Sequence, residues 1–222
     1  IKATEMEIFK LAALANINVN PKGSCGDIAA STFGGWLVYK TFYKDWVLKE
    51  KEKNSITDLL KKDWPGLYID RLNPPKDLKL VVGWTGSPAN TINLVNSMED
   101  SSLNKESIYD EFLTNSKKCV IKMIKAFKEE DIEEIQKQIL VNRELLYNLG
   151  GNLGIRIETS QLKKLCNIAL KHGGAAKSSG AGGGDCGIAI FKKGDNLKKL
   201  IEEWGKANIY YLPLKVYDGK EE

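Results

Sequence analysis

The first third of the chain alternates between helix-like and strand-like patterns of apolar residues. Apolar side chains recur at helical spacing between residues 6 and 14, and later segments alternate as strands do. The expected elements are, in order, a helix over 6–14, a turn over 18–23, a helix that begins near Asp27 and ends at Gly34-Gly35, a strand over 36–42, a helix from Ser55 to Pro65 and a strand over 67–72. The mixed charge run Lys49–Lys53 is interpreted as a solvated turn between strands.

Helical patterns dominate after Pro74-Pro75, which is expected to end the first domain. The elements expected here are a strand over 78–84, a helix near 91–97, helices over 107–128 and 131–148, a helix over 161–170, a strand over 188–191, a helix over 197–204 and a strand over 209–216. Asp131 is placed as an N-cap and Gly150-Gly151 as a helix end. This order predicts an α+β sandwich with an antiparallel sheet. The predicted domains are residues 1–75 and 76–222.

Composition narrows the class of protein. With 222 residues, 42% of them hydrophobic and 28% charged, the chain is typical of a soluble globular protein. The net charge of +4 is mild and its lysines are scattered among acidic residues, which argues against nucleic acid or membrane as the main partner and suits a small anionic substrate. No apolar run is long enough to span a membrane.

The four cysteines are far apart and the chain has one histidine, so metal-ligand spacing is absent and no metal site is expected. The same cysteine usage favours a reducing, cytoplasmic location. His172 precedes Gly173-Gly174 near an expected helix end, where it is interpreted as a complement to the helix dipole in preference to a catalytic group. Arg143 is expected to make a solvent-facing salt bridge, with an anion contact as the minor alternative.

The stretch Lys177–Gly187, KSSGAGGGDCG, is the densest in glycine and is called here the glycine-rich stretch. Glycine permits positive φ and close approach of the backbone, so successive N–H groups can surround an anion such as a phosphate. The stretch lacks the ending of a Walker A loop, and a formal dinucleotide match leads into a strand, not a helix. A phosphate-binding loop is favoured over a plain hairpin connection or linker.

Two further segments contain small or hydroxyl-bearing residues. In Gly23–Ser31, small side chains would let a backbone approach a ligand, and Asp27 falls where a helix begins. Spacing alone favours Asp27 as an N-cap or first-turn carboxylate of this helix. The run Thr85–Ala89 follows a strand, where it is equally consistent with substrate contacts and with an ordinary strand-to-helix connection.

The segments GSCGDIAAS at 23–31 and KSSGAGGGDCGIAI at 177–190 together resemble the central and C-terminal motifs of the GHMP small-molecule kinases. The run Gly83–Ala89 and the ending Asp185-Cys186-Gly187 are similar to the bacterial branch that acts on 5-phosphomevalonate, in its staphylococcal type. The resemblance extends over essentially the whole chain. It implies a GHMP fold, with residues 1–75 as the remainder of the N-terminal domain and 76–222 as a ferredoxin-like C-terminal domain.

The resemblance also implies an activity. Family members transfer the γ-phosphoryl group of ATP, with Mg²⁺, to a small acceptor in a cleft between the two domains; in this branch the product is 5-diphosphomevalonate, a precursor of isoprenoids. Asp27 matches the active-site aspartate, which replaces the capping interpretation. The residues expected to bind substrate or phosphate are Lys177, Ser179, Gly180, Ala181, Gly182 and Gly183, with Ser31 and Thr85 as weaker candidates.

One family motif does not occur in this sequence. The nucleotide loop Pro-x-x-x-Gly-Leu-Gly-Ser-Ser-Ala-Ala is not found, nor is the N-terminal lysine that faces the aspartate. The expectation is a C-terminal portion of the kinase that is inactive alone, with ATP and Mg²⁺ held mostly by a missing N-terminal segment. The alternatives are another GHMP enzyme (mevalonate kinase or diphosphomevalonate decarboxylase) and a non-catalytic anion-binding domain of that fold.

Overall fold

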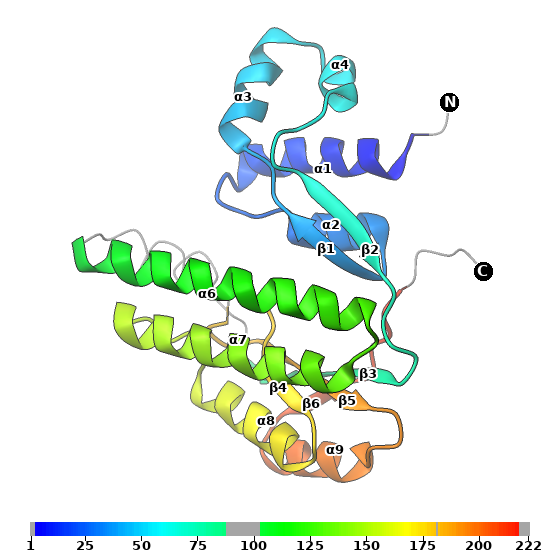
Figure 1. The fold of residues 1–222 in the computed structure, drawn as a ribbon, viewed down its shortest axis with the longest axis vertical. Helices are drawn as coiled ribbons and strands as arrows, with labels where there is room; N and C mark the ends of the chain where they lie inside the picture. The colour runs from blue at the N-terminus through cyan, green and yellow to red at the C-terminus, as the bar shows by residue number, and fades with distance from the viewer. Residues whose placement is uncertain (1–2, 88–102, 181, 218–222) are drawn as a thin grey trace. The chain divides into compact units, whose positions relative to one another are not determined.

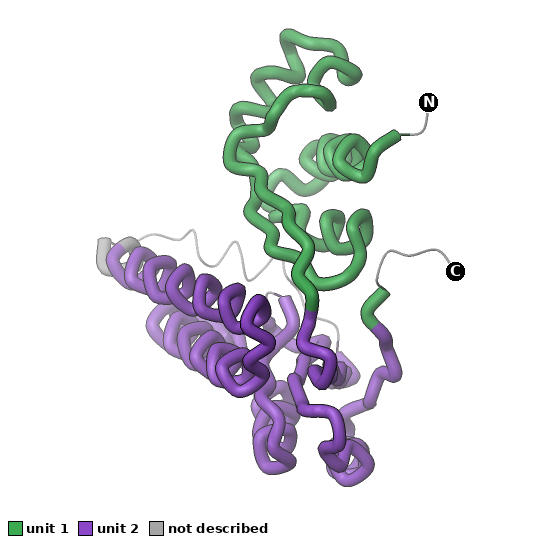
Figure 2. Tube along the Cα trace, turned by 45° about the vertical axis from the view of Figure 1, so that its right-hand side comes forward, with its two compact units in different colours: residues 1–73, 216–222 green, residues 74–215 purple. Residues whose placement is uncertain are grey.

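The computed structural model describes residues 3–87, 103–180 and 182–217. The chain divides into two compact units, Ile1–Asn73 with Val216–Glu222 and Pro74–Lys215 (Figure 2). The boundary falls two residues before the one expected from Pro74-Pro75. Residues 216 and 217 are grouped with the first unit and not with the second, and the Gly35 N–H donates to the Tyr217 carbonyl oxygen at 2.5 Å.

The first unit contains α1 (Glu5–Val19), α2 (Gly26–Phe33), β1 (Trp36–Lys40), α3 (Lys44–Lys53), α4 (Ile56–Lys61) and β2 (Tyr68–Leu72) (Figure 1). β1 and β2 pair antiparallel, with Trp36 opposite Leu72. A capping box in which Thr4 and Glu7 exchange hydrogen bonds fixes the start of α1. The predicted helices near 6–14 and Asp27 and both predicted strands are confirmed.

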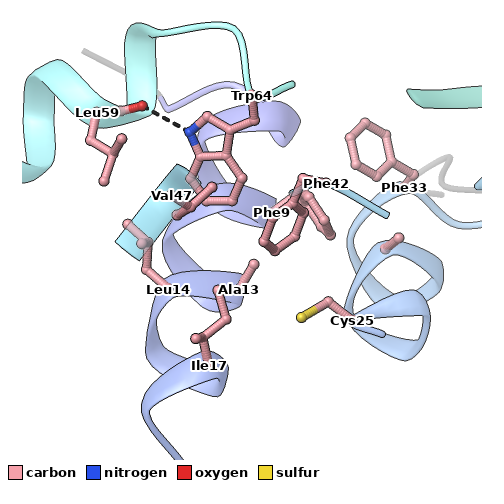
Figure 3. Close-up of a cluster of buried hydrophobic side chains, with 11 residues drawn as sticks. Phe9, Ala13, Leu14, Ile17, Cys25, Phe33, Phe42, Val47, Leu59 and Trp64 are labelled. Carbon is pink, nitrogen blue, oxygen red and sulfur yellow. Dashed lines mark hydrogen bonds between the residues drawn. The ribbon is translucent and has the colours of Figure 1, made fainter. Parts of the chain in front are cut away.

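Aromatic residues form the centre of this unit's core (Figure 3). The Phe9 ring lies 6.2, 6.1 and 6.4 Å from the rings of Phe33, Tyr39 and Phe42, measured between centroids. Trp64 packs edge-on against Phe42, and its indole N–H donates to the Leu59 carbonyl oxygen at 3.0 Å. Because this buried N–H has a partner, the indole adds packing area without an unsatisfied donor.

The charge run Lys49–Lys53 is helical, so its interpretation as a turn is wrong. The run forms the second half of α3, a helix in which Val47 is the buried residue. A helix with so narrow an apolar stripe gives almost no periodic signal in the sequence. Alternating Lys and Glu side chains support it at the surface, where Lys53 lies 4.0 Å from Glu50.

The second unit contains β3 (Leu78–Trp84), α6 (Leu103–Lys128), α7 (Ile132–Leu153), α8 (Ser160–Lys171), β4 (Ala175–Ser178), β5 (Cys186–Lys192), α9 (Leu197–Lys206) and β6 (Tyr210–Leu212). Its sheet has the order β4-β5-β3-β6, and all its neighbouring strands are antiparallel. In Figure 1, α6 and α7 run side by side above the strands β4, β5 and β6, and α8 and α9 are drawn below these strands. The predicted α+β class with an antiparallel sheet is therefore confirmed.

The core of the second unit lies between its sheet and helices α8 and α9. Its largest side chain is Trp204, fully buried, whose indole N–H donates to the Leu165 carbonyl oxygen at 3.1 Å. Glycines of the sheet make this packing close: a Cβ on Gly187 would lie 2.6 Å from one methyl carbon of Leu165, and a Cβ on Gly83 would lie 2.9 Å from the other. At the other end of α8, His172 is the C-cap, as the sequence predicts, and its Nε2 lies 3.4 Å from a Glu203 carboxylate oxygen.

Three predictions for this unit differ from the structure. α7 continues through Gly150-Gly151 and ends at a left-handed cap on Gly154, so the predicted end is wrong. Gly150 serves a close approach instead, because a Cβ there would lie 2.5 Å from the Ile155 carbonyl oxygen. β4 has no counterpart among the predicted elements, and the closing strand is shorter than predicted. The helix expected near 91–97 lies outside the described residues.

Candidate functional site

The glycine-rich stretch forms the turn of a β-hairpin in the second unit. β4 and β5 pair antiparallel with Ser178 opposite Gly187, and the Ser179 N–H donates to the Cys186 carbonyl oxygen at 2.9 Å. Residues 179–185 therefore make up the connection, called the hairpin loop below. Lys177 belongs to β4, and Cys186 and Gly187 belong to β5, so the loop is shorter at both ends than the sequence pattern predicts.

The loop backbone is left-handed over much of its length. φ is +62° at Gly180, +82° at Gly182, +81° at Gly183 and +134° at Gly184. Side-chain-bearing residues seldom adopt these angles, so the glycine content is explained by conformation. The non-glycine residue Asp185 also has a φ of +62°.

Hydrogen bonds hold the loop at two places, which distinguishes it from a flexible linker. The Gly183 N–H donates to the Ile157 carbonyl oxygen at 2.7 Å, and Ile157 is buried. The Asp185 N–H donates to the Ser87 carbonyl oxygen at 2.7 Å, and the Thr85 N–H donates to the Asp185 carbonyl oxygen at 2.8 Å. The loop is thus fixed against the connection that precedes α8 and against the segment that follows β3.

Thr85 carries a buried hydroxyl beside this loop. Its side chain is 6% exposed, and the Oγ1 atom has no hydrogen-bond partner among the described residues. A buried hydroxyl without a partner destabilises the fold by about 1–3 kcal/mol. Such an atom next to a glycine-lined turn is a candidate ligand contact, as the sequence suggests for Thr85.

Lys177 lies on β4, where it is partly buried, and not on the loop. Its ammonium donates to the Ser178 carbonyl oxygen at 2.8 Å, and no carboxylate of the described ranges forms an ion pair with it. Burial lowers the pKa of Lys177, and the nearby thiols of Cys166 and Cys119 offset this only in part. An ammonium that lacks an anionic partner is electrostatically suited to an anionic ligand, and a direct contact between Lys177 and phosphate stays a prediction.

Asp27 and Ser31 lie in the first unit, on α2. Asp27 is the second residue of that helix and is exposed; Ser31, one turn further along, is exposed as well. The N-cap is Cys25, with a left-handed φ of +60° and no side-chain capping bond, so Asp27 is not the cap. Its carboxylate makes no hydrogen bond or ion pair with other residues that the structure describes. Tyr39 fixes the preceding turn by donating to the Ser24 carbonyl oxygen at 2.6 Å.

The second unit thus brings together the hairpin-loop residues Ser179, Gly180, Gly182 and Gly183 with Thr85, while Ala181 lies outside the described residues. Asp27 and Ser31 form a separate group in the other unit. Two groups that shape the surroundings of the loop are not among the site residues predicted from the sequence. The Ile157 carbonyl is a backbone group without a sequence signal, and Arg143 is half-buried against Glu158 instead of making the expected solvent-facing salt bridge.

No group of three or more potential metal-ligating side chains occurs within residues 3–87, 103–180 and 182–217. The four cysteines are free thiols, three of them buried. Over the same ranges, no helix combines the length and the apolar character that a transmembrane segment needs.

Comparison with known proteins finds a family model that matches part of the second unit. Residues 123–209, which include β4, the hairpin loop and β5, match the family model "GHMP kinases C terminal". The chain has the GHMP kinase fold, a mixed arrangement of helices and antiparallel sheet.

Relatives that match almost the whole chain include phosphomevalonate kinases. The phosphomevalonate kinase of Streptomyces sp. strain CL190 is 38% identical over 94% of this chain and 56% of its own length. A solved structure of Streptococcus pneumoniae phosphomevalonate kinase in complex with phosphomevalonate and AMPPNP has a TM-score of 0.84 and 30% identity, covering 96% of this chain and 61% of that one. The Lin0012 protein of Listeria innocua gives a TM-score of 0.90 and 41% identity, with 95% and 59% coverage. The chain is thus a homologue of phosphomevalonate kinases and spans somewhat more than half their length, which confirms the family resemblance.

Proposed function

We propose that the protein to which this chain belongs transfers the γ-phosphoryl group of ATP to 5-phosphomevalonate, giving 5-diphosphomevalonate and ADP. The observation that carries this proposal is the hairpin loop: a glycine-lined turn, anchored at Gly183 and Asp185, next to the unpartnered hydroxyl of Thr85. The homology to phosphomevalonate kinases and the solved complex of one such enzyme with phosphomevalonate and AMPPNP support the choice of substrates. The proposal includes a role in isoprenoid synthesis and a cytoplasmic location, which is consistent with soluble, charged substrates.

The bonds that change define what the residues must do. The bond between the γ-phosphorus of ATP and its bridging oxygen breaks, a bond forms from an oxygen of the acceptor phosphate, and ADP leaves. A phosphate monoester has its second pKa near 6, so the acceptor is already largely ionised at neutral pH. Catalysis then depends on positioning and on neutralising negative charge, with little need for a strong base.

The described residues supply the parts of this chemistry that concern the acceptor. The N–H groups of Gly180, Gly182 and Gly184, which donate no hydrogen bond to the described residues, are suited to bind phosphate oxygens, and the Lys177 ammonium on β4 adds positive charge. We assign Asp27 an orienting role in the first unit, with Ser31 on the same face of α2. ATP and Mg²⁺ belong to the proposal as co-substrate and metal, and Mg²⁺ would neutralise phosphate charge. No group of three ligating side chains for it occurs in the described part, so no step is assigned to it.

Comparison of acceptors tests the assignment against related reactions. With the full-length protein and ATP, we expect ADP release to depend on 5-phosphomevalonate, with mevalonate and 5-diphosphomevalonate at background. Release that depends on mevalonate would assign the protein as a mevalonate kinase. ADP and carbon dioxide formed together from 5-diphosphomevalonate would assign it as the decarboxylase. Phosphate binding without ADP release would favour the non-catalytic domain.

Thr85→Val separates a ligand contact from a purely structural threonine. The replacement is nearly isosteric and removes an unpaired buried hydroxyl, so the free energy of unfolding is expected to rise by about 1–3 kcal/mol. If the hydroxyl contacts the acceptor, KM for 5-phosphomevalonate should also rise about tenfold, as expected for one lost hydrogen bond. Chemical denaturation and steady-state kinetics measure the two effects. A gain in stability with unchanged KM would contradict the substrate role of Thr85.

A further inference from the structure

Arg143 lies on α7, outside the glycine-rich stretch, but it is joined to the hairpin loop by a short series of contacts. Its Nε donates to Oε2 of Glu158 at 2.6 Å, and its Nη2 donates to Oε1 of the same carboxylate at 2.9 Å. The guanidinium also donates to Oδ1 of Asn167 on α8 at 3.1 Å. One side chain thus joins α7, Glu158 and α8.

Most of the surface of this ion pair is removed from solvent. The side chains of Arg143 and Glu158 are 16% and 6% exposed. The hydrogen bonds to Glu158 raise the pKa of Arg143 above its usual value, although burial opposes the shift. A two-pronged contact between a guanidinium and a carboxylate fixes orientation as well as distance, which a surface pair of flexible side chains does not.

Glu158 is adjacent to the residue that anchors the loop. Residues 155–158, called the connector, link the end of α7 to the Thr159 N-cap of α8. Within it, the Ile157 carbonyl oxygen accepts the Gly183 N–H at 2.7 Å and would lie 2.5 Å from a Cβ on Gly182. The loop backbone therefore follows the position of this carbonyl closely.

The connector has no regular structure of its own that would hold it. It borders a pocket of about 430 Å³ lined by residues that include Gly151, Gly154 and Arg156, so part of its surface has no packing partner. Its other attachments include the buried Ile157 side chain, the Ile155 side chain packed beside it, and the Ile155 N–H, which donates to the Gly150 carbonyl oxygen at 2.8 Å. The contact between Arg143 and Glu158 adds an attachment at the connector's last residue.

We infer that Arg143 is a positioning residue for phosphoryl transfer: it holds Glu158, and through the connector it fixes the Ile157 carbonyl that sets the hairpin loop. This inference rests on the proposed function for its catalytic consequence, but the link from Arg143 to the loop is a property of the fold. It can therefore be measured without substrate.

The test uses four variants of the full-length protein. Arg143→Lys keeps the charge but loses the two-pronged geometry. Arg143→Met leaves the carboxylate of Glu158 buried without its cationic partner, which lowers stability. The double variant Arg143→Met/Glu158→Met removes both charges, so this variant recovers stability without restoring the contact. Lys171→Met is the matched control, because it removes an ion pair of 2.7 Å with Glu203 that is exposed and does not involve the connector.

Hydrogen exchange of the Gly183 amide, followed by NMR with ¹⁵N-glycine labelling, reports on the loop, and thermal unfolding and steady-state kinetics accompany it. In the double variant we expect a melting temperature near that of the wild type, Gly183 exchange about tenfold faster and kcat lower by about ten- to a hundredfold. Arg143→Lys should be intermediate, and Lys171→Met should match the wild type.

Gly183 exchange and kcat that return to wild-type values in the double variant would overturn the inference, because Arg143 would then matter only for stability. If neither the wild type nor any variant transfers phosphoryl groups, the proposed function is wrong, but the link from Arg143 to the loop is still tested. In that case Gly183 exchange alone decides whether Arg143 positions the loop.

Discussion

Replacing Asp27 with asparagine is expected to lower kcat for phosphorylation of 5-phosphomevalonate by about a hundredfold, the size of effect that lost positioning produces. The free energy of unfolding should change by about 0.5 kcal/mol or less, because this exposed carboxylate makes no hydrogen bond or ion pair with the described residues. Steady-state kinetics and chemical denaturation of the full-length variant measure the two quantities.

The pH profile of Asp27→Asn identifies the role of the side chain. Because the acceptor phosphate is already ionised at neutral pH, an orienting aspartate predicts a rate that stays low as the pH rises. A rate that recovers steeply at high pH would contradict this and assign Asp27 as a general base. Asp45→Asn is the control, since Asp45 is also an exposed acidic residue in the first turn of a helix of the same unit.

Gly182→Ala is expected to damage the hairpin loop severely. The new Cβ would lie 2.5 Å from the Ile157 carbonyl oxygen, and the residue would have to keep a φ of +82°. The left-handed backbone alone destabilises by about 1–3 kcal/mol, and the clash with a fixed carbonyl adds to it. We expect kcat to fall by about a hundredfold or more as the loop moves from its anchor.

Gly180→Ala provides the comparison for Gly182→Ala. Gly180 has a φ of +62°, and a Cβ there would meet nothing within 4 Å. Both variants carry a left-handed alanine, so the difference between their free energies of unfolding measures the contact with Ile157. Equal losses in denaturation experiments would show that this contact does not fix the loop.

Most of the fold could be predicted from the sequence, because its helices and strands have clear apolar periodicity. The exceptions have physical causes. α3 has one buried residue, Val47, and so gives no periodic signal. α7 contains Gly150 within its last turns because the Ile155 carbonyl oxygen approaches there, an interaction between positions that local patterns do not encode.

The glycine-rich stretch and Asp27 are visible in the sequence because their motifs are local. The anchoring of the loop is not, because it depends on carbonyl oxygens of Ile157 and Ser87 from distant segments. Arg143 is missed for a related reason: an arginine on an amphipathic helix has the same pattern whether its partner is solvent or a buried glutamate 15 residues along the chain. The partial burial of Lys177 likewise depends on β4, a strand that the neighbouring glycines obscure in the sequence pattern.

Phosphorus NMR of the reaction mixture tests the central claim most directly. The full-length protein is incubated with ATP, Mg²⁺ and 5-phosphomevalonate, and the phosphorus signals are followed over time. We predict that the phosphomonoester signal of the acceptor is replaced by two mutually coupled signals of a diphosphate as those of ADP appear. A phosphomonoester signal that persists while ATP is hydrolysed to ADP and orthophosphate would contradict the assignment.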